Sequence, residues 1–461
     1  YMAGSPTELI KEKLDIVEFL RGYLALQAAG KNFKALCPFH REKTASFMIS
    51  PDRQSWHCFG CALGGDIFAF LMRYENVEFG EALRILADKA GVELRRLNPA
   101  EYKFTGLLHE INEVATQFFR KGFEQSKLAR QYTEERGLKS ETIEEFDIGW
   151  APNESETLSL HLLNSGYNPS DVLQAGLSFK TDRGLMVDRF RGRIMFPIHN
   201  HFGKVVGFTG RILPKFDTGE MGKYVNSPET PLFSKSKVLY GFWKSKNAIR
   251  ELGSAFLVEG QMDFLMSWQS GVKNVVASSG TALTLDHLRV LRRLTDQLVI
   301  SFDADEAGAQ AGERAIELAE ANDFGVKVAM FEKFKDPADA AHADPENLRR
   351  VVLDARPAME FYFDKYLPKK GFKMGDREHL KNLRAVLMRI RNIASPVERS
   401  HWLKELARRT GVEEKVLSEE SARLTETRGP VREEKAETVT VSGESKSRRE
   451  LISQKLLSMA L

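Results

Sequence analysis

The feature that most restricts the fold is a regular alternation of apolar strands and helices between residues 255 and 331. Short runs of strand length, rich in Val, Ile, Leu and Phe, are separated by longer helical patterns. This alternation predicts a parallel, doubly wound α/β sheet. The predicted strands are residues 255–258, 275–277, 298–302 and 326–331, and the predicted helices are residues 261–270, 284–294 and 306–322.

Acidic residues follow three of these strands. Glu259 and Asp303 come directly after the first and third strands, and Asp336 follows the fourth. Open α/β sheets bind ligands at the carboxyl ends of their strands, so we expect these acids to lie together. Crowded carboxylates need a cation, and oxygen ligands suit Mg²⁺. The sequence therefore predicts a one- or two-metal phosphoryl-transfer centre. Its candidate ligands are Glu259, Asp263, Asp303, Asp305, Asp336 and Asp339.

The roles within this acidic group differ. Glutamate is a poor helix cap, so we expect Glu259 to be the general base or to orient the attacking hydroxyl. Asp303 and Asp305 complete the predicted catalytic set. An alternative is that Asp303 or Asp336 only caps the following helix. That alternative explains one acid better than three successive strands that each end in one.

A second site is predicted near the N-terminus. All three cysteines lie between positions 37 and 61, and they form two pairs with two-residue gaps, Cys37 with His40 and Cys58 with Cys61. An odd number of cysteines argues against a disulfide framework. Four N and S ligands on two knuckles predict a closed, structural Zn²⁺ site. His57 is an alternative to His40, although it breaks the paired spacing.

Cations and aromatic residues alternate around these ligands. This pattern is typical of surfaces that stack bases and track phosphates of single-stranded nucleic acid. Lys34, Lys43 and Trp56 are the predicted DNA contacts of this domain. Phe33, Phe47 and Phe59 fit equally well as the core of a small domain.

The length and composition predict several domains. The chain has 461 residues, of which 42% are hydrophobic, and a net charge of +3. This net charge does not by itself indicate nucleic-acid binding. Residues 188–237 are locally basic, however, with nine Lys and Arg against four Asp and Glu. The absence of a long apolar run excludes a membrane span, and we expect a cytoplasmic protein.

The predicted fold class is multidomain α+β and α/β, with four folded regions and polar connections. They are a zinc ribbon (1–95), a linker (96–105), a mixed α/β subdomain (106–250), the parallel sheet (251–344), a helical subdomain (345–423), a disordered linker (424–448) and a truncated helical start (449–461).

Several motifs in this order resemble a known family. The acids Glu259-Gly260-x-x-Asp263 and Asp303-x-Asp305, with the later Asp336, are similar to the Toprim domain. The upstream motifs and the cysteine ribbon resemble bacterial DnaG-type primases. These upstream motifs are Asp188-Arg189-Phe190-Arg191-Gly192-Arg193-Ile194-Met195-Phe196-Pro197, Gly207-Phe208-Thr209-Gly210-Arg211, Lys223-Tyr224-Val225-Asn226-Ser227-Pro228-Glu229-Thr230, and Phe233-Ser234-Lys235 running on to Leu239-Tyr240-Gly241.

The resemblance implies an enzyme that makes short RNA primers on single-stranded DNA from ribonucleoside triphosphates. It implies one structural Zn²⁺, one to three catalytic Mg²⁺ or Mn²⁺ ions, and work at the replication fork on the nucleoid. A basic ridge would hold nucleotide phosphates and the template. Its predicted residues are Arg189, Arg193, Arg211, Lys223, Tyr224, Asn226 and Lys235.

Two departures and two alternatives accompany this resemblance. The family's usual Asp-Pro-Asp is Asp336-Pro337-Ala338-Asp339 here, so Asp339 is the candidate second acid and the metal preference could differ. The family's helicase-binding region is mostly missing, so we expect weak or no helicase binding. A non-catalytic recombination mediator and a topoisomerase also carry Toprim domains. The basic segment argues against the first, and the motif context of Tyr224 and Tyr240 argues against the second.

Overall fold

A computed structural model describes residues 6–424, apart from 41, 76, 78, 93–98, 220–221, 304, 332, 369–370, 374 and 394. The described chain divides into two compact units at the boundary between Phe361 and Tyr362. Among the helices of the described part, none has the length and apolar character needed to cross a membrane.

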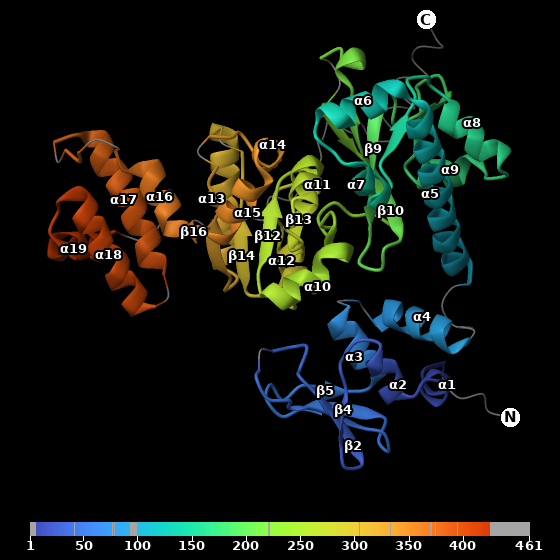
Figure 1. Cartoon of the computed structure of the whole chain (residues 1–461), viewed down its shortest axis with the longest axis horizontal. Coiled ribbons are helices and arrows are strands. Elements are labelled where there is room, and N and C mark those ends of the chain that lie inside the picture. Colours follow the sequence, from blue (N-terminus) through green and yellow to red (C-terminus); the bar gives the residue numbers. More distant parts are fainter. Residues whose placement is uncertain are drawn as a thin grey trace, which may run out of the picture. The chain divides into compact units, whose positions relative to one another are not determined.

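The first domain of the first unit is a five-stranded antiparallel sheet, in the order β1-β2-β3-β4-β5, with four helices (Figure 1). Rings of Phe47, Phe70 and Trp56 lie at the centre of its core. The strands are β1 (Gln27–Ala29), β2 (Asn32–Ala35), β3 (Phe47–Ser50), β4 (Ser55–Cys58) and β5 (Gly64–Gly65), and the helices are α1 (Pro6–Lys13), α2 (Ile16–Arg21), α3 (Ile67–Tyr74) and α4 (Phe79–Ala90).

The predicted linker over 96–105 is partly wrong. Helix α5 (Pro99–Gln125) starts inside it and runs for 27 residues. Its buried positions Leu108, Ile111 and Ala115 repeat at helical spacing, so this face packs into a core and continues the helix upstream. Residues 96–98 of the predicted linker lie outside the described residues.

A second sheet follows, with strand order β11-β10-β9-β6. The long central strands β9 and β10 are buried along their whole length, because helices and the neighbouring parallel sheet cover both faces. Its elements are α6 (Lys127–Glu135), α7 (Ser140–Glu145), β6 (Gly149–Ala151), α8 (Thr157–Asn164), α9 (Pro169–Gln174), the hairpin β7 (Ser178–Lys180) and β8 (Met186–Asp188), β9 (Arg193–His199), β10 (Val205–Ile212), η1 (Pro214–Phe216) and β11 (Tyr224–Asn226).

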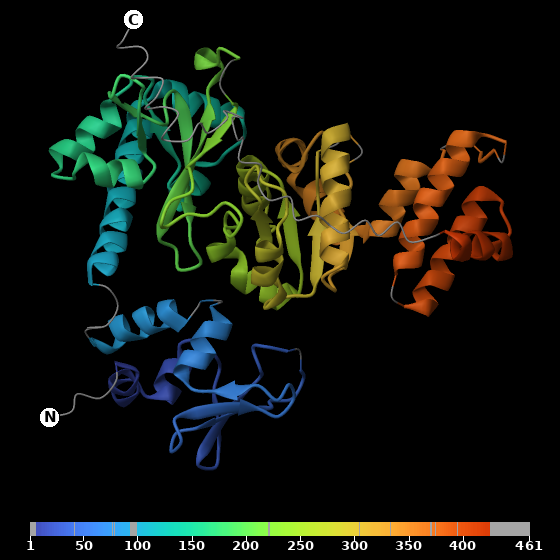
Figure 2. The same ribbon diagram turned by 180° about the vertical axis from the view of Figure 1, so that it is seen from behind.

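The parallel sheet is confirmed, with strand order β13-β12-β14-β15-β16, of which only β16 is antiparallel. Figure 2, seen from behind, brings α13 to the front of this sheet, whereas α11, α14 and α15 pack together against it. Its elements are α10 (Phe242–Leu252), β12 (Ala255–Val258), α11 (Gln261–Gln269), β13 (Val275–Ala277), α12 (Leu285–Arg292), β14 (Gln297–Ile300), α13 (Glu306–Glu320), β15 (Gly325–Val328), α14 (Pro337–Ala343), α15 (Pro345–Leu353) and β16 (Arg356–Pro357).

The second unit starts at Tyr362, not at residue 345 as the sequence predicts. The difference arises because α15 and β16 complete the parallel-sheet layer, and the chain leaves that layer only within α16 (Ala358–Tyr366). The unit is helical, as expected, with Leu383, Leu387 and Leu406 in its interior. Its other helices are α17 (Arg377–Asn392), α18 (Pro396–Thr410) and α19 (Glu414–Arg423). The predicted segments 424–448 and 449–461 lie outside the described residues beyond Leu424.

Candidate active site and metal centre

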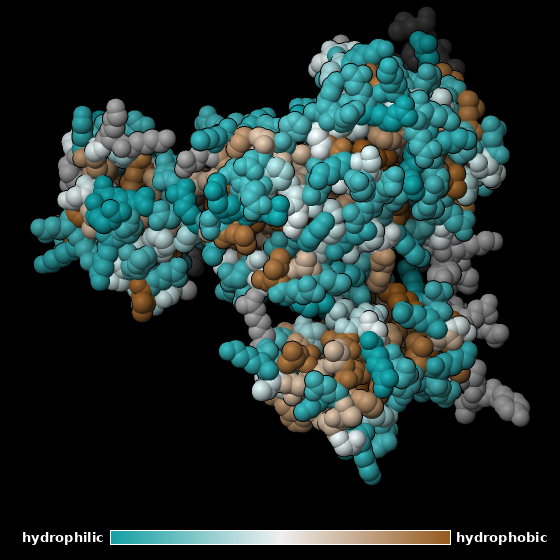
Figure 3. Space-filling model, viewed as in Figure 1, coloured by the Kyte–Doolittle hydropathy of each residue, from teal (hydrophilic) through white to brown (hydrophobic). Residues whose placement is uncertain are grey.

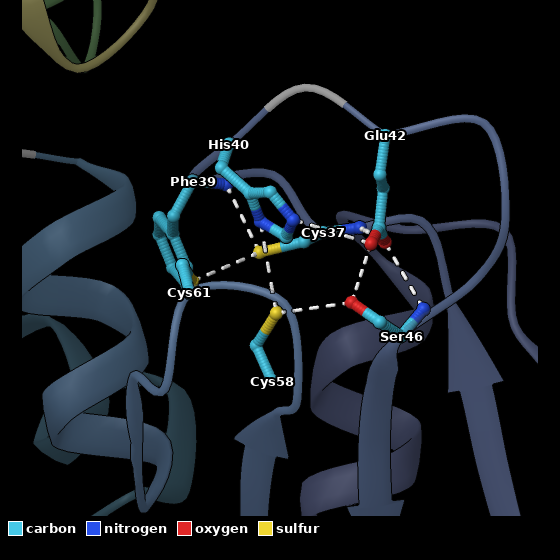
Figure 4. A network of polar contacts seen from close by, with 7 residues as sticks. All are labelled: Cys37, Phe39, His40, Glu42, Ser46, Cys58 and Cys61. Atoms are coloured by element: carbon cyan, nitrogen blue, oxygen red, sulfur yellow. Dashed lines mark hydrogen bonds and ion pairs between the residues drawn. The ribbon is translucent and has the colours of Figure 1, made fainter.

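Cys37, His40, Cys58 and Cys61 come together at one point. Their ligand atoms all lie within 4.8 Å of one another. The Sγ atoms of Cys37 and Cys61 are 3.9 Å apart, and Cys58 Sγ is 3.7 Å from His40 Nδ1. Zinc–sulfur bonds of about 2.3 Å in a tetrahedron place neighbouring ligand atoms about 3.8 Å apart. The four side chains point toward one another (Figure 4), and they fit a closed, four-coordinate zinc ion.

The backbone brings the two knuckles together through a tight contact. Cys37 follows β2 and Cys58 ends β4, and the ladder from β2 through β3 to β4 fixes their separation. A Cβ atom at Gly60 would lie 2.3 Å from His40 Nε2. Only glycine therefore lets the second knuckle approach the histidine ring.

Glu42 orients this cluster, and the sequence analysis missed it. Its carboxylate lies 3.3 Å from His40 Nε2, the ring nitrogen that faces away from the ligand cluster. It also accepts hydrogen bonds from the amides of Cys37 (2.7 Å) and Ser46 (3.1 Å) and from the Ser46 hydroxyl. Burial opposes ionisation, but the donated hydrogen bonds lower the pKa of Glu42. A carboxylate behind a ligating histidine fixes the ring's tautomer and orientation.

Trp56 is not a surface residue, which corrects its predicted role as a DNA contact. Its side chain is only 2% exposed, it stacks on Phe47 at 4.8 Å, and its Nε1 donates to the Asp66 carbonyl. Successive side chains of β4 point to opposite faces, so Trp56 shares the core face with the zinc ligand Cys58. The core interpretation is right for Phe47 and wrong for Phe59, which is 74% exposed.

The opposite face of this sheet carries the exposed residues. The strand register places Lys34, Met48 and His57 in one row across β2, β3 and β4. His57 is exposed, and its ring contacts the Phe59 ring edge-on at 4.8 Å. His57 is therefore part of this face and not a zinc ligand. Lys43 is exposed in the loop between β2 and β3. On the visible side of this domain, hydrophobic residues (brown and pale) lie among hydrophilic ones (teal), as Figure 3 shows.

A second site lies at the carboxyl edge of the parallel sheet. Glu259 follows β12, and its carboxylate accepts a 3.2 Å hydrogen bond from the Asp303 amide, which follows β14. Asp263 is 8% exposed and accepts from the amides of Gly260 and Ala338, both at 3.1 Å. The loops after β12, β14 and β15 thus meet at one rim, as parallel topology requires.

Like charge accumulates at this rim. Burial, and then the nearby Asp336 carboxylate, raise the pKa of Asp263 to about 8. Burial, and then Glu259 and Asp336, raise the pKa of Asp303 to about 6, although Lys335 lies 4.0 Å away. Each carboxyl group therefore meets negative charge that the side chains do not balance. A bound cation would supply the balance.

Of the two residues that the capping alternative named, one caps a helix. Asp336 caps α14 by accepting from the Asp339 amide at 2.8 Å. Asp305, and not Asp303, caps α13 by accepting from the Gly308 amide at 2.8 Å. A Cβ atom at Gly308 would lie 2.3 Å from the Asp303 carbonyl, so glycine lets α13 begin close to the rim.

The carboxylates of the rim are less tightly grouped than the ligand atoms of the cysteine cluster. Apart from that cluster, no group of three His, Cys, Asp or Glu side chains in the described ranges has its ligand atoms within the same span. Ala338, at the position where the resembling family has its second acid, is buried. Asp339 lies one residue further on, in the first turn of α14.

Cations gather beside this rim. Arg211 lies between the rings of Tyr132 (5.7 Å) and Tyr224 (5.1 Å), and its guanidinium donates to the Tyr224 hydroxyl. Lys223 is exposed, and its pKa is lowered first by Arg211, then by burial, and then by Lys335 and Arg136. The sequence analysis missed Tyr132 and Arg136. Arg136 lies at the end of α6, directly before Gly137. This position is the sequence signal that could have identified Arg136 as a candidate.

Arg193 does not lie on the surface of this basic group, which corrects its predicted phosphate contact. It is 2% exposed, and its guanidinium donates to the carbonyls of Gly210, Gly222 and Lys223 at 3.0–3.2 Å. These bonds fix the backbone that carries Lys223. Arg193 therefore stabilises the backbone of the basic segment.

The remaining predicted ridge residues occupy different environments. Arg189 is half-buried, donates to the Gly176 carbonyl and lies over the Phe179 ring. The Asn226 amide bonds to Thr209 and to the Ser279 carbonyl. The backbone of Lys235 contacts Glu229 and His287. The basic and tyrosine side chains that interact with one another and with the acids are Arg136, Arg211, Lys223, Tyr224 and Lys335.

A Cys/His cluster that fits a structural zinc ion and a carboxylate rim beside cations on a parallel sheet are the arrangement expected of an enzyme that binds metal ions and phosphates. Three segments match models of known families. They are described as CHC2 zinc finger (residues 4–102), DNA primase catalytic core, N-terminal domain (118–246) and Toprim-like (256–341).

Known proteins agree over most of the chain. DNA primase of Listeria monocytogenes is 36% identical over 423 residues, which cover 88% of this chain and 67% of that protein. DNA primase of Geobacillus stearothermophilus is 36% identical over 437 residues, covering 92% and 72%. The chain belongs to the bacterial DNA primase family, and it is a nucleotidyltransferase of that family. The family match removes the recombination mediator and the topoisomerase as alternatives.

Solved structures agree as well. The zinc-binding and RNA polymerase domains of Aquifex aeolicus primase match with a TM-score of 0.58 and 29% identity, covering 90% of this chain and 99% of that chain. The RNA polymerase domain of Mycobacterium tuberculosis primase matches with a TM-score of 0.58 and 33% identity, covering 65% and 97%. Another match is a DnaG primase catalytic domain bound to single-stranded DNA, with a TM-score of 0.56.

Proposed function

We propose that this primase joins ribonucleoside triphosphates into a short RNA primer on single-stranded DNA, and that the rim around Glu259 is the reaction centre. The observation that carries this proposal is the meeting of Glu259, Asp303 and Asp263 at one sheet edge beside Arg211 and Lys223. Negative and positive groups side by side suit a substrate that brings both phosphate and its counter-cation.

The carboxylates are suited to hold a hard divalent cation. Asp303 and Asp263 meet unbalanced negative charge, and Asp305 and Asp336 each use one oxygen for a helix cap. Mg²⁺ or Mn²⁺ in this place would supply positive charge for the triphosphate oxygens. Asp339 remains a proposed further ligand.

Glu259 is the proposed proton acceptor. The hydroxyl oxygen at the primer's 3′ end forms a bond to the α-phosphorus of the incoming nucleotide, and the bond from that phosphorus to the pyrophosphate oxygen breaks. The hydroxyl proton passes to the Glu259 carboxylate, and pyrophosphate leaves with the bonding electrons. The Asp303 amide holds the carboxylate in place through its 3.2 Å hydrogen bond.

The cations beside the rim are proposed to bind phosphate. Lys223 is exposed, whereas Arg211 is 8% exposed, donates to the Tyr224 hydroxyl and lies near the rings of Tyr132 and Tyr224. Fixed cations stabilise charge on a leaving pyrophosphate without reorganising. Arg136, Tyr224 and Lys335 belong to the same group, and Arg189 and Lys235 are proposed to contact the template backbone.

The zinc domain is proposed to read the template with the row Lys34, Met48 and His57, together with Phe59 and Lys43. Stacking of bases on exposed aromatic rings and neutralisation of phosphate by lysine are the usual means of holding a single strand. Phe59 takes the role that the sequence analysis gave to Trp56. A replicative helicase is the proposed protein partner.

Substitution of the proposed base tests this function. Glu259→Gln is expected to lower primer synthesis at least a hundredfold, because the amide cannot accept the proton. The assay combines single-stranded DNA, ribonucleotides and Mg²⁺ or Mn²⁺, with the RNA resolved by length. DNA affinity, followed by fluorescence anisotropy, should stay within about twofold.

Glu306→Gln is the matched control, because Glu306 is exposed in the first turn of α13 close to the rim in sequence. It should keep normal synthesis. Normal synthesis by Glu259→Gln would exclude Glu259 as the base, and no RNA from the unaltered protein with either metal would exclude the proposed reaction.

A further inference from the structure

The loop after β13 contains a backbone conformation that needs an explanation. Ser279 has a φ of 59°, in the left-handed region that side chains other than glycine rarely adopt, and Gly280 follows with a φ of 75°. The Ser279 hydroxyl does not explain it, because this oxygen is buried and no described group bonds to it. Strained residues of this kind persist where the surrounding structure holds them, and they cluster near functional sites.

The surrounding structure holds Ser279 from both sides of its peptide. Its amide donates to the Glu259 carbonyl at 3.0 Å. Its carbonyl accepts from the Asn226 side chain at 2.9 Å. The left-handed turn lets both bonds form at one residue. Ser279 therefore joins the loop after β12, which carries Glu259, to strand β11, which carries Asn226.

The other end of the Asn226 amide closes a ring. Asn226 Oδ1 accepts from the Thr209 hydroxyl at 2.6 Å, and that hydroxyl accepts from Gln261 Nε2 at 3.0 Å. Gln261 is two residues beyond Glu259, at the start of α11. Thr209 is completely buried and Gln261 is 2% exposed, so water does not compete for these bonds.

We propose that Ser279, Asn226 and Thr209 are positioning residues, which set the location of Glu259 relative to the nucleotide-binding strand. Asn226 lies two residues from Tyr224 on β11, and Glu259 lies two residues from Gln261. The ring therefore joins the cation side and the acid side of the rim through four hydrogen bonds. Asn226 acts through this ring and not through a phosphate contact. The proposal rests on the function proposed above.

Substitution at Thr209 tests the ring without touching substrate groups. Thr209→Val keeps the shape of the side chain and removes the hydroxyl that bridges Asn226 and Gln261. Thr209→Ser keeps the hydroxyl and is the matched control. Thr209→Val is expected to lower kcat for extension of a supplied primer about five- to tenfold, the worth of roughly one buried hydrogen bond. Its KM for nucleotide and its DNA affinity should stay within about twofold, and Thr209→Ser should keep most of the rate.

Hydrogen exchange gives a readout that does not depend on activity. The Ser279 amide should exchange several-fold faster in Thr209→Val than in the unaltered protein and in Thr209→Ser. An inactive unaltered protein would contradict the proposed function, while the exchange comparison would still decide whether the ring exists. Equal loss in both variants would assign the effect to packing and overturn the proposal. A raised KM at unchanged kcat would also overturn it, because it would make Asn226 a nucleotide contact.

Discussion

Arg193 illustrates how a basic side chain in a basic segment can serve the fold. Its three carbonyl partners hold the segment around Gly222 and Lys223 against β10. Removing it would leave the buried Gly210 carbonyl and two partly buried carbonyls without their donor, which costs more than the loss of a surface contact.

Arg193→Met is therefore expected to destabilise the protein by about 2–4 kcal/mol, because buried bonds to a charged group are lost. Chemical denaturation followed by circular dichroism measures this change. Arg183→Met, at an exposed position of the β7–β8 hairpin, should leave stability within about 0.5 kcal/mol. Unchanged stability with weaker nucleotide binding in Arg193→Met would restore the predicted phosphate contact.

Phe59 and Trp56 make the opposite contrast within a few residues. Phe59→Ala should weaken binding of single-stranded DNA about tenfold, since stacking of one base on an aromatic ring contributes about 1–3 kcal/mol. Its unfolding free energy should not fall, because the ring is 74% exposed. Anisotropy with a labelled oligonucleotide measures the affinity.

Phe79→Ala is the matched control, because Phe79 is also a partly exposed phenylalanine of this domain, on α4. It should bind DNA normally. Trp56→Ala should instead unfold the domain more easily, by about 3–5 kcal/mol. Equal DNA affinity of the Phe59 and Phe79 variants would remove Phe59 from the proposed template surface.

Among the helices, the start of α12 contains a group that titrates. Thr284 accepts from the His287 amide, and His287 Nδ1 accepts from the Thr284 amide at 3.4 Å, so the ring must be neutral at Nδ1. Nε2 is 3.3 Å from the Lys235 carbonyl. His287 is completely buried, and burial lowers its pKa to about 4.

The folded protein binds this proton less readily than the unfolded chain, whose histidine pKa is about 6.5. Stability should therefore be lost as the pH falls from about 6.5 toward 4, and it should be fully present above that range. His199, also buried with its pKa lowered to about 4, adds a loss of the same sign. Urea denaturation at several pH values measures both.

His287→Gln separates the cap from the titration. Glutamine at this position can complete the same capping box with Thr284 and carries no titrating group. Its stability should depend less steeply on pH between 6.5 and 4 than that of the unaltered protein. An identical pH dependence would show that His287 does not contribute to the acid sensitivity.

We expect template reading and chemistry to lie on different domains of the molecule. The four predicted zinc ligands would leave no open position for a reacting group, and the proposed proton acceptor lies on another domain. Chelation of zinc should therefore reduce de novo initiation on single-stranded DNA more than tenfold, because the template surface loses the knuckles that carry Phe59.

Extension of an annealed RNA primer should fall much less under the same treatment, and re-addition of zinc should restore initiation. Both reactions are measured on the full chain with the same template. Equal loss of initiation and extension would contradict this division between template reading and chemistry.

Much of the site was predictable because it depends on short-range geometry. Two-residue gaps bring ligands to one ion whatever surrounds them, and strands of a parallel sheet end at one edge. In this way the sequence predicted that Cys37 lies with His40 and that Glu259 lies with Asp303. The alternation along β4 even placed Trp56 on the same side as Cys58, which was an available signal of its burial.

The sequence by itself thus determined which four side chains form the Cys/His cluster, that the sheet is parallel, and at which end of it the acids gather. Only the tertiary structure decided which cations lie beside the acids and which support the fold, since that depends on segments far apart in the chain. Arg193 is buried because Gly222 and Gly210 come to it, and Asn226 is anchored because the turn at Ser279 reaches β11. Composition and spacing carry no information about such partners, because a side chain's burial is fixed by what packs over it.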